Sequence, residues 1–351
     1  MTDKHRLYVV SIGMITPVGV DTETTAAAVK AGVSSYKESD FFDDNFNRIK
    51  MSCVPQELLH DCLVEDVIVS ELQPRHARML QLAKLAIAQI VEQIPKNNTI
   101  PLILAGPEST GPDDQQLTNI FLQNLSIQSG IDLDLVNSRV ISLGRAGGLD
   151  AIDLAMRYLA VADKDYVLVG AVDTFHEKNV MDYFLAKGRL CANDAMDGFV
   201  PGEGAAFLLL SNKRKLNSDG ASPFVLEPGL DQEKGHLYSD EIYTGSGLAK
   251  AFAKAVSKSS IKNINAIYSS MNGEHYFAKE LGVALMRNTL LHNSNSELLH
   301  PADCYGDLGA AAGIVMIGLS CMALQKERGP SSFLVYASSD GASRSAAIVS
   351  K

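Results

Sequence analysis

The pattern of hydrophobic positions divides the chain into short apolar runs and amphipathic segments. Residues 75–94 carry apolar side chains at a helical period, whereas 8–12, 101–105 and 166–172 are short apolar runs that predict strands. Strands that alternate with helical segments along a chain are typical of α/β proteins. The pattern therefore predicts an α/β fold built around central sheets.

One transition between strand and helix is unusual. Residues 140–149 read Val-Ile-Ser-Leu-Gly-Arg-Ala-Gly-Gly-Leu, so a β-branched run ends at Gly144, Arg145 follows at the corner, and a helix is predicted over 149–162. Such an elbow brings free backbone N–H groups and the helix dipole together, and proteins place nucleophiles or bound anions there. Arginine is neither a nucleophile nor a general base at neutral pH.

The second half of the chain repeats the order of elements in the first. In each half a Gly-rich turn precedes an Ala-rich helix, an apolar strand and a run of small residues, and Asp307 holds the place in the second half that Arg145 holds in the first. We predict an internal duplication with halves at 1–215 and 222–351, joined by a polar linker at 212–222. The elements predicted in the second half are helices at 248–255, 278–288 and 310–325 and strands at 265–270 and 333–337.

Three other segments have weaker patterns. Residues 13–19, with two glycines and a proline, predict a turn, and the mixed, aromatic residues 41–65 predict an irregular segment. Residues 198–210 predict a hairpin whose second strand is entirely apolar.

Composition and charge limit the classes of partner and compartment. The net charge is −10 and no long Lys/Arg run occurs, which disfavours nucleic acid and anionic membrane surfaces. Five cysteines, without CxxC spacing, indicate reduced thiols rather than disulfides or a zinc site. No apolar signal segment or membrane span is evident, so we expect a cytoplasmic protein without a metal or cofactor.

Three motifs together resemble those of a known family. They are Val9-Val-Ser-Ile-Gly-Met-Ile-Thr-Pro-Val-Gly, Asp197-Gly-Phe-Val-Pro-Gly-Glu-Gly-Ala-Ala and Gly306-Asp-Leu-Gly-Ala-Ala-Ala-Gly. In this order they resemble the β-ketoacyl-acyl-carrier-protein synthases of the thiolase-like superfamily, over nearly the whole chain. The resemblance implies a thiolase-like fold, in which duplicated α/β halves form a layered α-β-α-β-α sandwich.

The resemblance also implies where catalytic residues would lie. The family uses a Cys nucleophile at the elbow, which takes the acyl chain, and two His that stabilise the enolate left by decarboxylation. The Cys position falls on Arg145, the two His positions fall on Asn272 and Asp307, and an accompanying Lys falls on Ala302. A Phe-rich gate falls on residues 338–343, which contain no Phe. All these positions depart from the pattern, so we expect no standard Claisen condensation and assign no catalytic residue.

The polar residues at these positions leave two interpretations open. If the resemblance holds, Arg145, Glu274, Asp307 and Asp340 face one pocket. They could form an ion network that fills the vacated acyl pocket and stabilises the fold. Alternatively, Arg145 binds a carboxylate or phosphate at the helix N-terminus, with Glu274 or Asp307 as the base.

Cysteine offers a further candidate nucleophile. Cys304 lies three residues before Asp307, and His275 or His300 could activate it. The alternative is a buried, inert thiol, which is the commoner state of cysteine. We interpret Cys191 and Glu203 as structural.

The resemblance implies three hypotheses about function. The first is a non-condensing partner, similar to the chain-length-factor subunits of fatty acid or polyketide-type biosynthesis, and the second is an orphan pseudo-ketosynthase that binds another protein. The third is an acyltransferase or acyl-thioester hydrolase that uses Arg145, Glu274 and Asp307, or Cys304. Decarboxylation of malonyl groups without condensation is disfavoured because both His positions are replaced. We expect a homodimer or a heterodimer with an active ketosynthase, acyl carrier protein as a further partner, and a dimer interface at the strand after the elbow helix.

Overall fold

The computed structural model describes residues 5–64, 72–95, 99–111, 114, 116–191, 197–214, 216–217, 220–259, 261, 263–288, 296–327 and 329–351. The helices are α1 (Thr22–Lys30), α2 (Gln56–Leu59), α3 (Pro74–Ala88), α4 (Asn119–Ser129), α5 (Gly147–Val161), α6 (Lys178–Ala186), α7 (Ser246–Ser257), α8 (His275–Arg287), α9 (Ala302–Tyr305) and α10 (Ala312–Lys326). Short 3₁₀ turns are η3 (Val91–Gln93), η4 (Gly144–Ala146) and η5 (Gly309–Ala311). The strands are β1 (Arg6–Ile15), β2 (Lys37–Phe42), β3 (Arg48–Met51), β4 (Leu102–Gly106), β5 (Arg139–Ser142), β6 (Tyr166–Thr174), β7 (Glu203–Ser211), β8 (Leu216–Asn217), β9 (Gly220–Ala221), β10 (Phe224–Leu226), β11 (Gly229–Gln232), β12 (Ala266–Ser269), β13 (Glu297–Leu299), β14 (Ser332–Ser338) and β15 (Ser343–Ser350).

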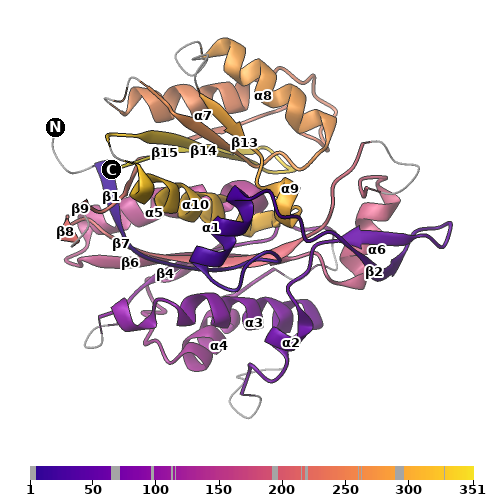
Figure 1. Ribbon diagram of the computed structural model, residues 1–351, viewed down its shortest axis with the longest axis horizontal. Helices are drawn as coiled ribbons and strands as arrows, with labels where there is room; N and C mark the ends of the chain where they lie inside the picture. Colours follow the sequence, from indigo (N-terminus) through magenta and orange to yellow (C-terminus); the bar gives the residue numbers. More distant parts are fainter. Residues whose placement is uncertain are drawn as a thin grey trace.

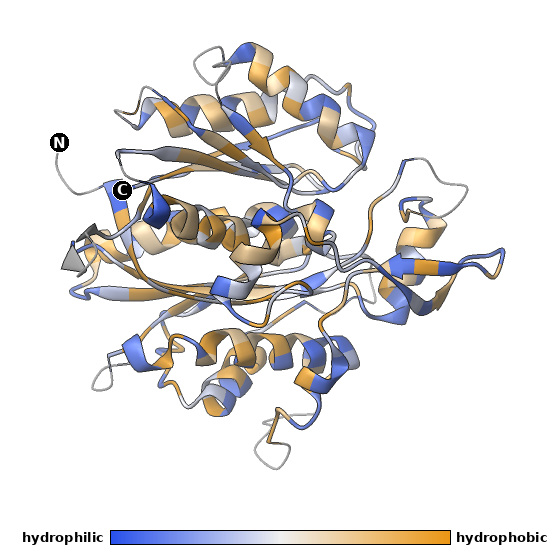
Figure 2. Cartoon of the chain, in the orientation of Figure 1, coloured by the Kyte–Doolittle hydropathy of each residue, from blue (hydrophilic) through white to orange (hydrophobic). Residues whose placement is uncertain are grey.

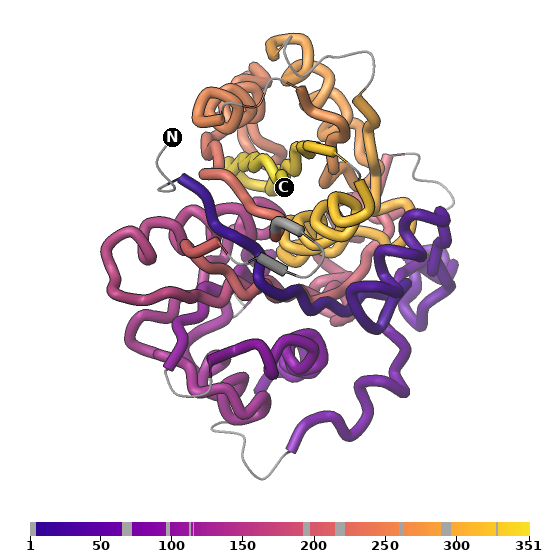
Figure 3. The backbone as a smooth tube through the Cα atoms, turned by 60° about the vertical axis from the view of Figure 1, so that its left-hand side comes forward, coloured from indigo at the N-terminus to yellow at the C-terminus, as the bar shows by residue number. Residues whose placement is uncertain are grey.

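The elements stack as five layers (Figure 1). Helices α7 and α8 cover the outer face of a sheet that contains β12, β14 and β15, and helices α3 and α4 cover the outer face of a sheet that contains β4, β6 and β7. Helices α5 and α10 lie between the two sheets. A second view shows the same separation of the earlier, indigo-to-magenta half from the orange C-terminal helices (Figure 3). This arrangement confirms the predicted α-β-α-β-α sandwich.

A short strand connects the two sheet layers. In the described residues the strand order is β13-β12-β14-β15-β10-β1-β7-β6-β4-β5, with β11 paired to β15. Strand β10 pairs antiparallel with β1 through Tyr8 opposite Phe224, and with β15 through Phe224 opposite Ser350. Both layers therefore belong to one continuous hydrogen-bonded sheet.

The middle helix α10 is the most apolar of the described helices (Figure 2). Helix α10 is apolar on all sides, as expected for a helix that packs between two sheets. Among the described residues, one helical segment, Gly309–Lys326, is long and apolar enough to cross a membrane, but 78% of it is buried inside the protein. It is therefore a core helix.

Glycines allow α5 and α10 to approach each other closely. A Cβ atom at Gly148 would lie 2.9 Å from Cγ1 of Ile314, and one at Gly313 would lie 3.3 Å from the carbonyl oxygen of Arg145. The small-residue run after each turn thus has a packing reason, because larger side chains would separate the two helices. This contact places the starts of the two helices side by side.

The structure corrects three predictions about local elements. Strand β1 continues to Ile15, so the turn predicted at 13–19 begins three residues later than expected. The segment predicted as irregular instead contains the end of β2 and all of β3 and α2. The hairpin predicted at 198–210 is wrong in its first limb, because β7 pairs with β1 and β6, while residues before it make only isolated bridges.

The predicted dimer strand is also wrong in its position. Strand β6, which follows the elbow helix, lies between β4 and β7 and has no free edge. The strand before the elbow, β5, ends the sheet and pairs with β4 on one side. The proposed division into halves stays a prediction; its boundary residues Met1 and Lys215 lie outside the described residues.

Candidate functional site

The elbow places Arg145 in the interior of the protein. After β5, Gly144 adopts a positive φ of 58°, and the 3₁₀ turn η4 leads into α5. A Cβ atom at Gly144 would lie 2.7 Å from Oε2 of Glu108, so glycine is required both by the backbone and by this neighbour. Arg145 is buried at the start of the helix.

Two carboxylates bind the Arg145 guanidinium. Nε lies 3.1 and 2.9 Å from the carboxylate oxygens of Asp307, and Nη2 donates to the same carboxylate. Nη1 donates to Oδ1 of Asp340 at 2.6 Å. The guanidinium carbon also lies 5.1 Å from the ring centre of Phe277. Every guanidinium nitrogen therefore has a carboxylate partner, an arrangement typical of planar, bidentate recognition.

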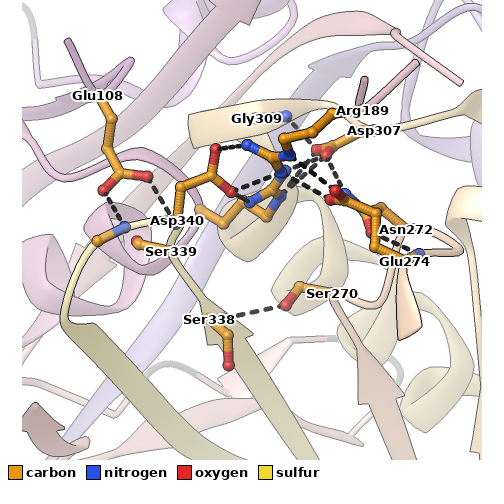
Figure 4. A network of polar contacts seen from close by, with 12 residues as sticks. Glu108, Arg189, Ser270, Asn272, Glu274, Asp307, Gly309, Ser338, Ser339 and Asp340 are labelled. Carbon is orange, nitrogen blue, oxygen red and sulfur yellow. Dashed lines mark hydrogen bonds and ion pairs between the residues drawn. The ribbon is translucent and has the colours of Figure 1, made fainter. Parts of the chain in front are cut away.

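A second arginine, which was not predicted, completes the network (Figure 4). Arg189 donates to both oxygens of Glu274, at 2.7 and 2.6 Å, and to both oxygens of Asp340, at 2.5 and 3.0 Å. Asn272 Nδ2 donates to Glu274 and to Asp307, each at 2.9 Å. Asp340 thus bridges the two arginines, and Asn272 joins their other carboxylates.

The charges of the network stabilise one another. Burial alone would raise the pKa of Asp340, but Arg145 and Arg189 hold it well below its usual range. Burial would lower the pKa of Arg145, but Asp307 and Asp340 raise it. Arg145 and Asp340 therefore stay ionised at neutral pH.

Glu108 is a further buried carboxyl group that was not predicted. It follows β4, and its oxygens accept the backbone N–H groups of Asp340 at 2.9 Å and Gly341 at 3.0 Å. Burial, together with the nearby charge of Asp340, raises the pKa of Glu108 to about 7. Glu108 and Arg145 both line a pocket of about 270 Å³.

The turn before α10 has an equivalent arrangement. Gly309 has a φ of 51°, and a Cβ atom there would overlap the carboxylate of Asp173. Asp173 accepts a hydrogen bond from the backbone N–H of Ala310 at 2.9 Å and forms an ion pair with Arg75 at 3.1 Å. Burial raises the pKa of Asp173 to about 6, although Arg75 opposes the shift.

The Cys/His candidates lie apart from this network. His275 is exposed and lies 3.1 Å from Asp197. Burial raises the pKa of the Cys304 thiol, whose sulfur lies 3.9 Å from the carbonyl oxygen of Val29. In the part of the chain that the structure describes, Cys304 forms no hydrogen bond with His275 or His300. The arrangement does not favour an activated nucleophile.

The remaining candidates have structural surroundings. Glu203 receives two 2.6 Å hydrogen bonds from Arg78 and one of 2.8 Å from the backbone N–H of Val54. Ala302 begins α9, and the half-buried Cys191 donates its backbone N–H to Phe199 at 2.9 Å. Among the described residues, no group of His, Cys, Asp and Glu side chains is arranged to hold a metal ion.

Glu108 and Arg189, which the sequence analysis did not identify, differ in how far the sequence indicates them. Glu108 lies in a polar run directly after a buried parallel strand, and functional side chains often lie at such strand ends, so this signal could have been used. Arg189 follows the Gly188 turn after α6 and reaches the network only because of the tertiary fold.

Comparisons with known proteins agree with this fold. Residues 143–215 match the family described as Beta-ketoacyl synthase, N-terminal domain. The 3-oxoacyl-(acyl-carrier-protein) synthase 2 of Vibrio cholerae is 25% identical over 308 residues, which cover 77% of this chain and 73% of that protein. A ketosynthase from module 6 of the bacillaene synthase of Bacillus subtilis has a TM-score of 0.78 and 13% identity, over 98% of this chain and 72% of that chain. The chain therefore has the fold of the ketosynthases, and residues 143–215 are similar to the N-terminal domain of the β-ketoacyl synthases.

Two further structures resemble this protein over the full length of both chains. The ishigamide ketosynthase/chain length factor has a TM-score of 0.74 and 16% identity, and covers 98% of each chain. A structure of a ketosynthase in complex with its chain length factor, from Xenorhabdus doucetiae, has a TM-score of 0.77 and 15% identity, over 99% of this chain and 98% of that chain. These similarities show the thiolase-like fold.

Proposed function

We propose that this protein is a non-condensing partner of an active ketosynthase, similar to a chain length factor, in fatty acid or polyketide-type biosynthesis. The observation that carries the proposal is the buried Arg145 at the elbow, held by Asp307 and Asp340. An arginine cannot take an acyl chain from a thioester, and these carboxylates neutralise it inside the protein. The backbone geometry of the elbow is therefore retained, but the Arg145 side chain at the elbow forms ion pairs within the protein and has a structural role.

The positions around the elbow support the loss of condensation. Asn272 and Asp307 stand where the resemblance expects the two histidines, and they hydrogen-bond to each other within the network. A carboxylate in this place repels a developing enolate instead of stabilising it. The site is therefore unsuited to the decarboxylation that precedes condensation.

The comparisons support the choice of a partner subunit. The ketosynthase/chain-length-factor structures match this chain over 98% of their own length, whereas the modular bacillaene ketosynthase matches over 72%. We extend to this chain the pairing of a ketosynthase with a chain length factor that those two structures contain. A cytoplasmic location and an interaction with acyl carrier protein remain predictions of the same proposal.

The free sheet edge offers a surface for the partner. Strand β5 ends the sheet, and an unpaired strand edge is a template for pairing with another chain. Two exposed apolar side chains lie on the same segment of chain: Val136, shortly before β5, is 81% exposed, and Val161, the last residue of α5, is 87% exposed. We infer that a dimer forms through the segment from Val136 to Val161.

No observation favours the rebuilt enzyme site. Glu274 is paired with Arg189, and Asp307 with Arg145, so neither carboxylate is available as a base beside an unpaired arginine. The binding-module hypothesis is compatible with the same network and differs only in the partner. The test below separates it from the chain-length-factor hypothesis.

The proposal is tested by reconstitution. The chain alone, incubated with acyl- and malonyl-carrier protein, should give no condensation product by mass spectrometry, and Arg145→Cys should give none either, because Asn272 and Asp307 are unchanged. An active ketosynthase encoded beside this chain should form a complex with it and produce chains of defined length only in that complex. Condensation by the chain alone would overturn the proposal, and a complex that leaves product length unchanged would favour the binding-module hypothesis.

The interface is tested by charge insertion. Val136→Glu and Val161→Glu should each weaken the complex at least tenfold in light scattering or calorimetry, because a charge replaces buried apolar contact. Met286→Glu is the matched control, since Met286 is 71% exposed near the end of α8 and should leave affinity within about twofold. Equal effects of all three variants would contradict the assignment of this surface.

A further inference from the structure

The β2–β3 hairpin ends in an exposed aromatic side chain. Figure 1 shows the hairpin beside α6, reaching beyond the stacked layers. Phe46, in the turn between the two strands, is 86% exposed and has a positive φ of 61°. A left-handed backbone disfavours a residue with a Cβ atom roughly tenfold, and an exposed ring gains little from burial in return. The folding of this chain alone therefore gives no reason for a phenylalanine at this position.

Hydrogen bonds hold the turn in one conformation. Oδ1 of Asp43 accepts the backbone N–H groups of Asn45 at 2.9 Å and Asn47 at 2.8 Å, and Oδ2 accepts the side-chain amide of Asn47 at 3.0 Å. The backbone N–H of Phe46 donates to the carbonyl oxygen of Asp43 at 3.0 Å. The left-handed backbone at Phe46 is thus built into the turn, and strained residues that a structure maintains in this way occur most often at functional sites.

The base of the hairpin is anchored in the protein. Ile49 and Met51 of β3 are buried in one apolar cluster with Phe184 of α6. Phe41 of β2 packs edge-on against His176, with the ring centres 5.3 Å apart. Because the base is anchored and the turn is hydrogen-bonded, binding at the tip costs little conformational entropy.

The charge of the hairpin indicates the chemistry of a partner. Residues 38–48 contain one cation and four carboxylates, those of Glu38, Asp40, Asp43 and Asp44. The cation, Arg48, pairs with Asp40 at 3.0 Å, so the exposed Asp44, two residues before Phe46, keeps its charge. These carboxylates repel anionic phospholipid and nucleic acid. A protein surface with Lys or Arg around an apolar pocket, in contrast, complements both the ring and the carboxylates.

We propose that the tip of the hairpin, residues 43–47, is a docking element for a second protein, and that Phe46 enters an apolar pocket bordered by lysine or arginine side chains of that protein. Aromatic side chains that fill a pocket commonly dominate the binding energy of an interface. The tip residues take no part in the arginine network, and the proposal does not depend on whether the partner is a ketosynthase.

The first measurement separates docking from folding. Asparagine tolerates a left-handed backbone, so Phe46→Asn should melt at the wild-type temperature or roughly 1–3 °C above it. Ile242→Asn is the matched control, because Ile242 is 85% exposed in the loop between β11 and α7 and its φ is not positive. It should change the melting temperature by less than about 1 °C. A lower melting temperature of Phe46→Asn would show that the ring stabilises the fold and would overturn the proposal.

The second measurement identifies the partner surface. Photoreactive benzoylphenylalanine in place of Phe46, in the cell that makes the protein, should cross-link to a peptide of another protein in which Lys or Arg lies beside apolar residues. The same probe in place of Ile242 should not give this product. A cross-link to a second copy of this chain, or none above that obtained at Ile242, would overturn the proposal.

The purified partner then tests the ring and the charge separately. Phe46→Asn and Asp44→Lys should each bind it at least tenfold more weakly than the wild type in calorimetry, whereas Ile242→Asn should bind as the wild type does. Added salt should weaken binding of the wild type, because it screens the exposed charges. An affinity that neither Phe46→Asn nor salt changes would contradict the proposed docking.

Discussion

The turns before α5 and α10 have the same backbone construction but different charges. Each begins with a left-handed glycine that packs against a carboxylate, Gly144 against Glu108 and Gly309 against Asp173. In the second turn Arg75 pairs with the carboxylate, and the turn itself carries alanines. In the first, Glu108 has only backbone donors, and the turn carries a buried Arg145.

The difference shows which features belong to the fold and which to the site. The glycine and its carboxylate recur in both halves, so they are explained by the geometry of a strand that turns into a core helix. The arginine network occurs at one turn and recruits carboxylates from the other half, since Asp307 and Asp340 both lie beyond residue 300. A substitution at Arg145 therefore tests the site, whereas one at a glycine tests the fold.

The largest expected effect follows from removing the charge at the first turn. Arg145→Ala leaves Asp307 buried without its cation and Asp340 with one of its two, which should lower the free energy of unfolding by about 3–5 kcal/mol. Urea denaturation measures this loss. Lys178→Ala, which breaks an exposed pair with Asp182 on α6, should cost less than about 1 kcal/mol. Similar losses for both variants would show that the network contributes no more than a surface ion pair.

The pH dependence of stability is expected to be a smaller effect, and it distinguishes Glu108 from Asp173. The folded pKa of Glu108 is about 7, above its ordinary 4.5, so its contribution to stability is full below pH 4.5 and is lost as the pH rises through 7. The change is on the order of 3 kcal/mol. Glu108→Gln should remove it, while Asp173→Asn should remove a similar change between pH 3.8 and about 6. Denaturation curves at several pH values measure this dependence. If the free energy of unfolding of each variant changes with pH as that of the wild type does, these assignments are wrong.

The smallest effect compares the glycines. Gly309→Ala should lower the free energy of unfolding by about 2 kcal/mol, and Gly144→Ala by about 1 kcal/mol, since both adopt a left-handed backbone but Glu108 has a longer, more adaptable side chain than Asp173. Gly282→Ala, in the middle of α8 with no atom near its Cβ position, should stabilise by up to about 1 kcal/mol. Thermal denaturation resolves the three variants, and the reverse order would contradict this account.

Local patterns predicted much of the fold. Periodicity indicated α3, β6 and the apolar strand β7, because each has a regular pattern of buried positions. The β2–β3 pair was missed because its strands alternate exposed polar and partly buried residues without a long apolar run. Strand pairing was the least predictable feature. Strand β6 lies inside the sheet because it pairs with β7, which begins only at residue 203, and no local pattern indicates this pairing.

The candidate site was predictable in part. The resemblance brought Arg145, Asn272, Asp307 and Asp340 into one hypothesis, and the structure places them in one network. Arg189 and Glu108 come from loops whose positions depend on the whole fold, so no local pattern identified their partners.

The pairing of β1 has a consequence for synthesis of the chain. Strand β1 is made first, but its partners are β7 and β10, which begin at residues 203 and 224. At about 5–20 residues per second, a ribosome needs roughly 10–40 s to make β7 after β1. During that interval β1, with its apolar residues, has neither neighbour in the sheet. The newly made N-terminal segment is therefore a natural binding site for chaperones, and β7 and β10, translated much later, complete the sheet around β1.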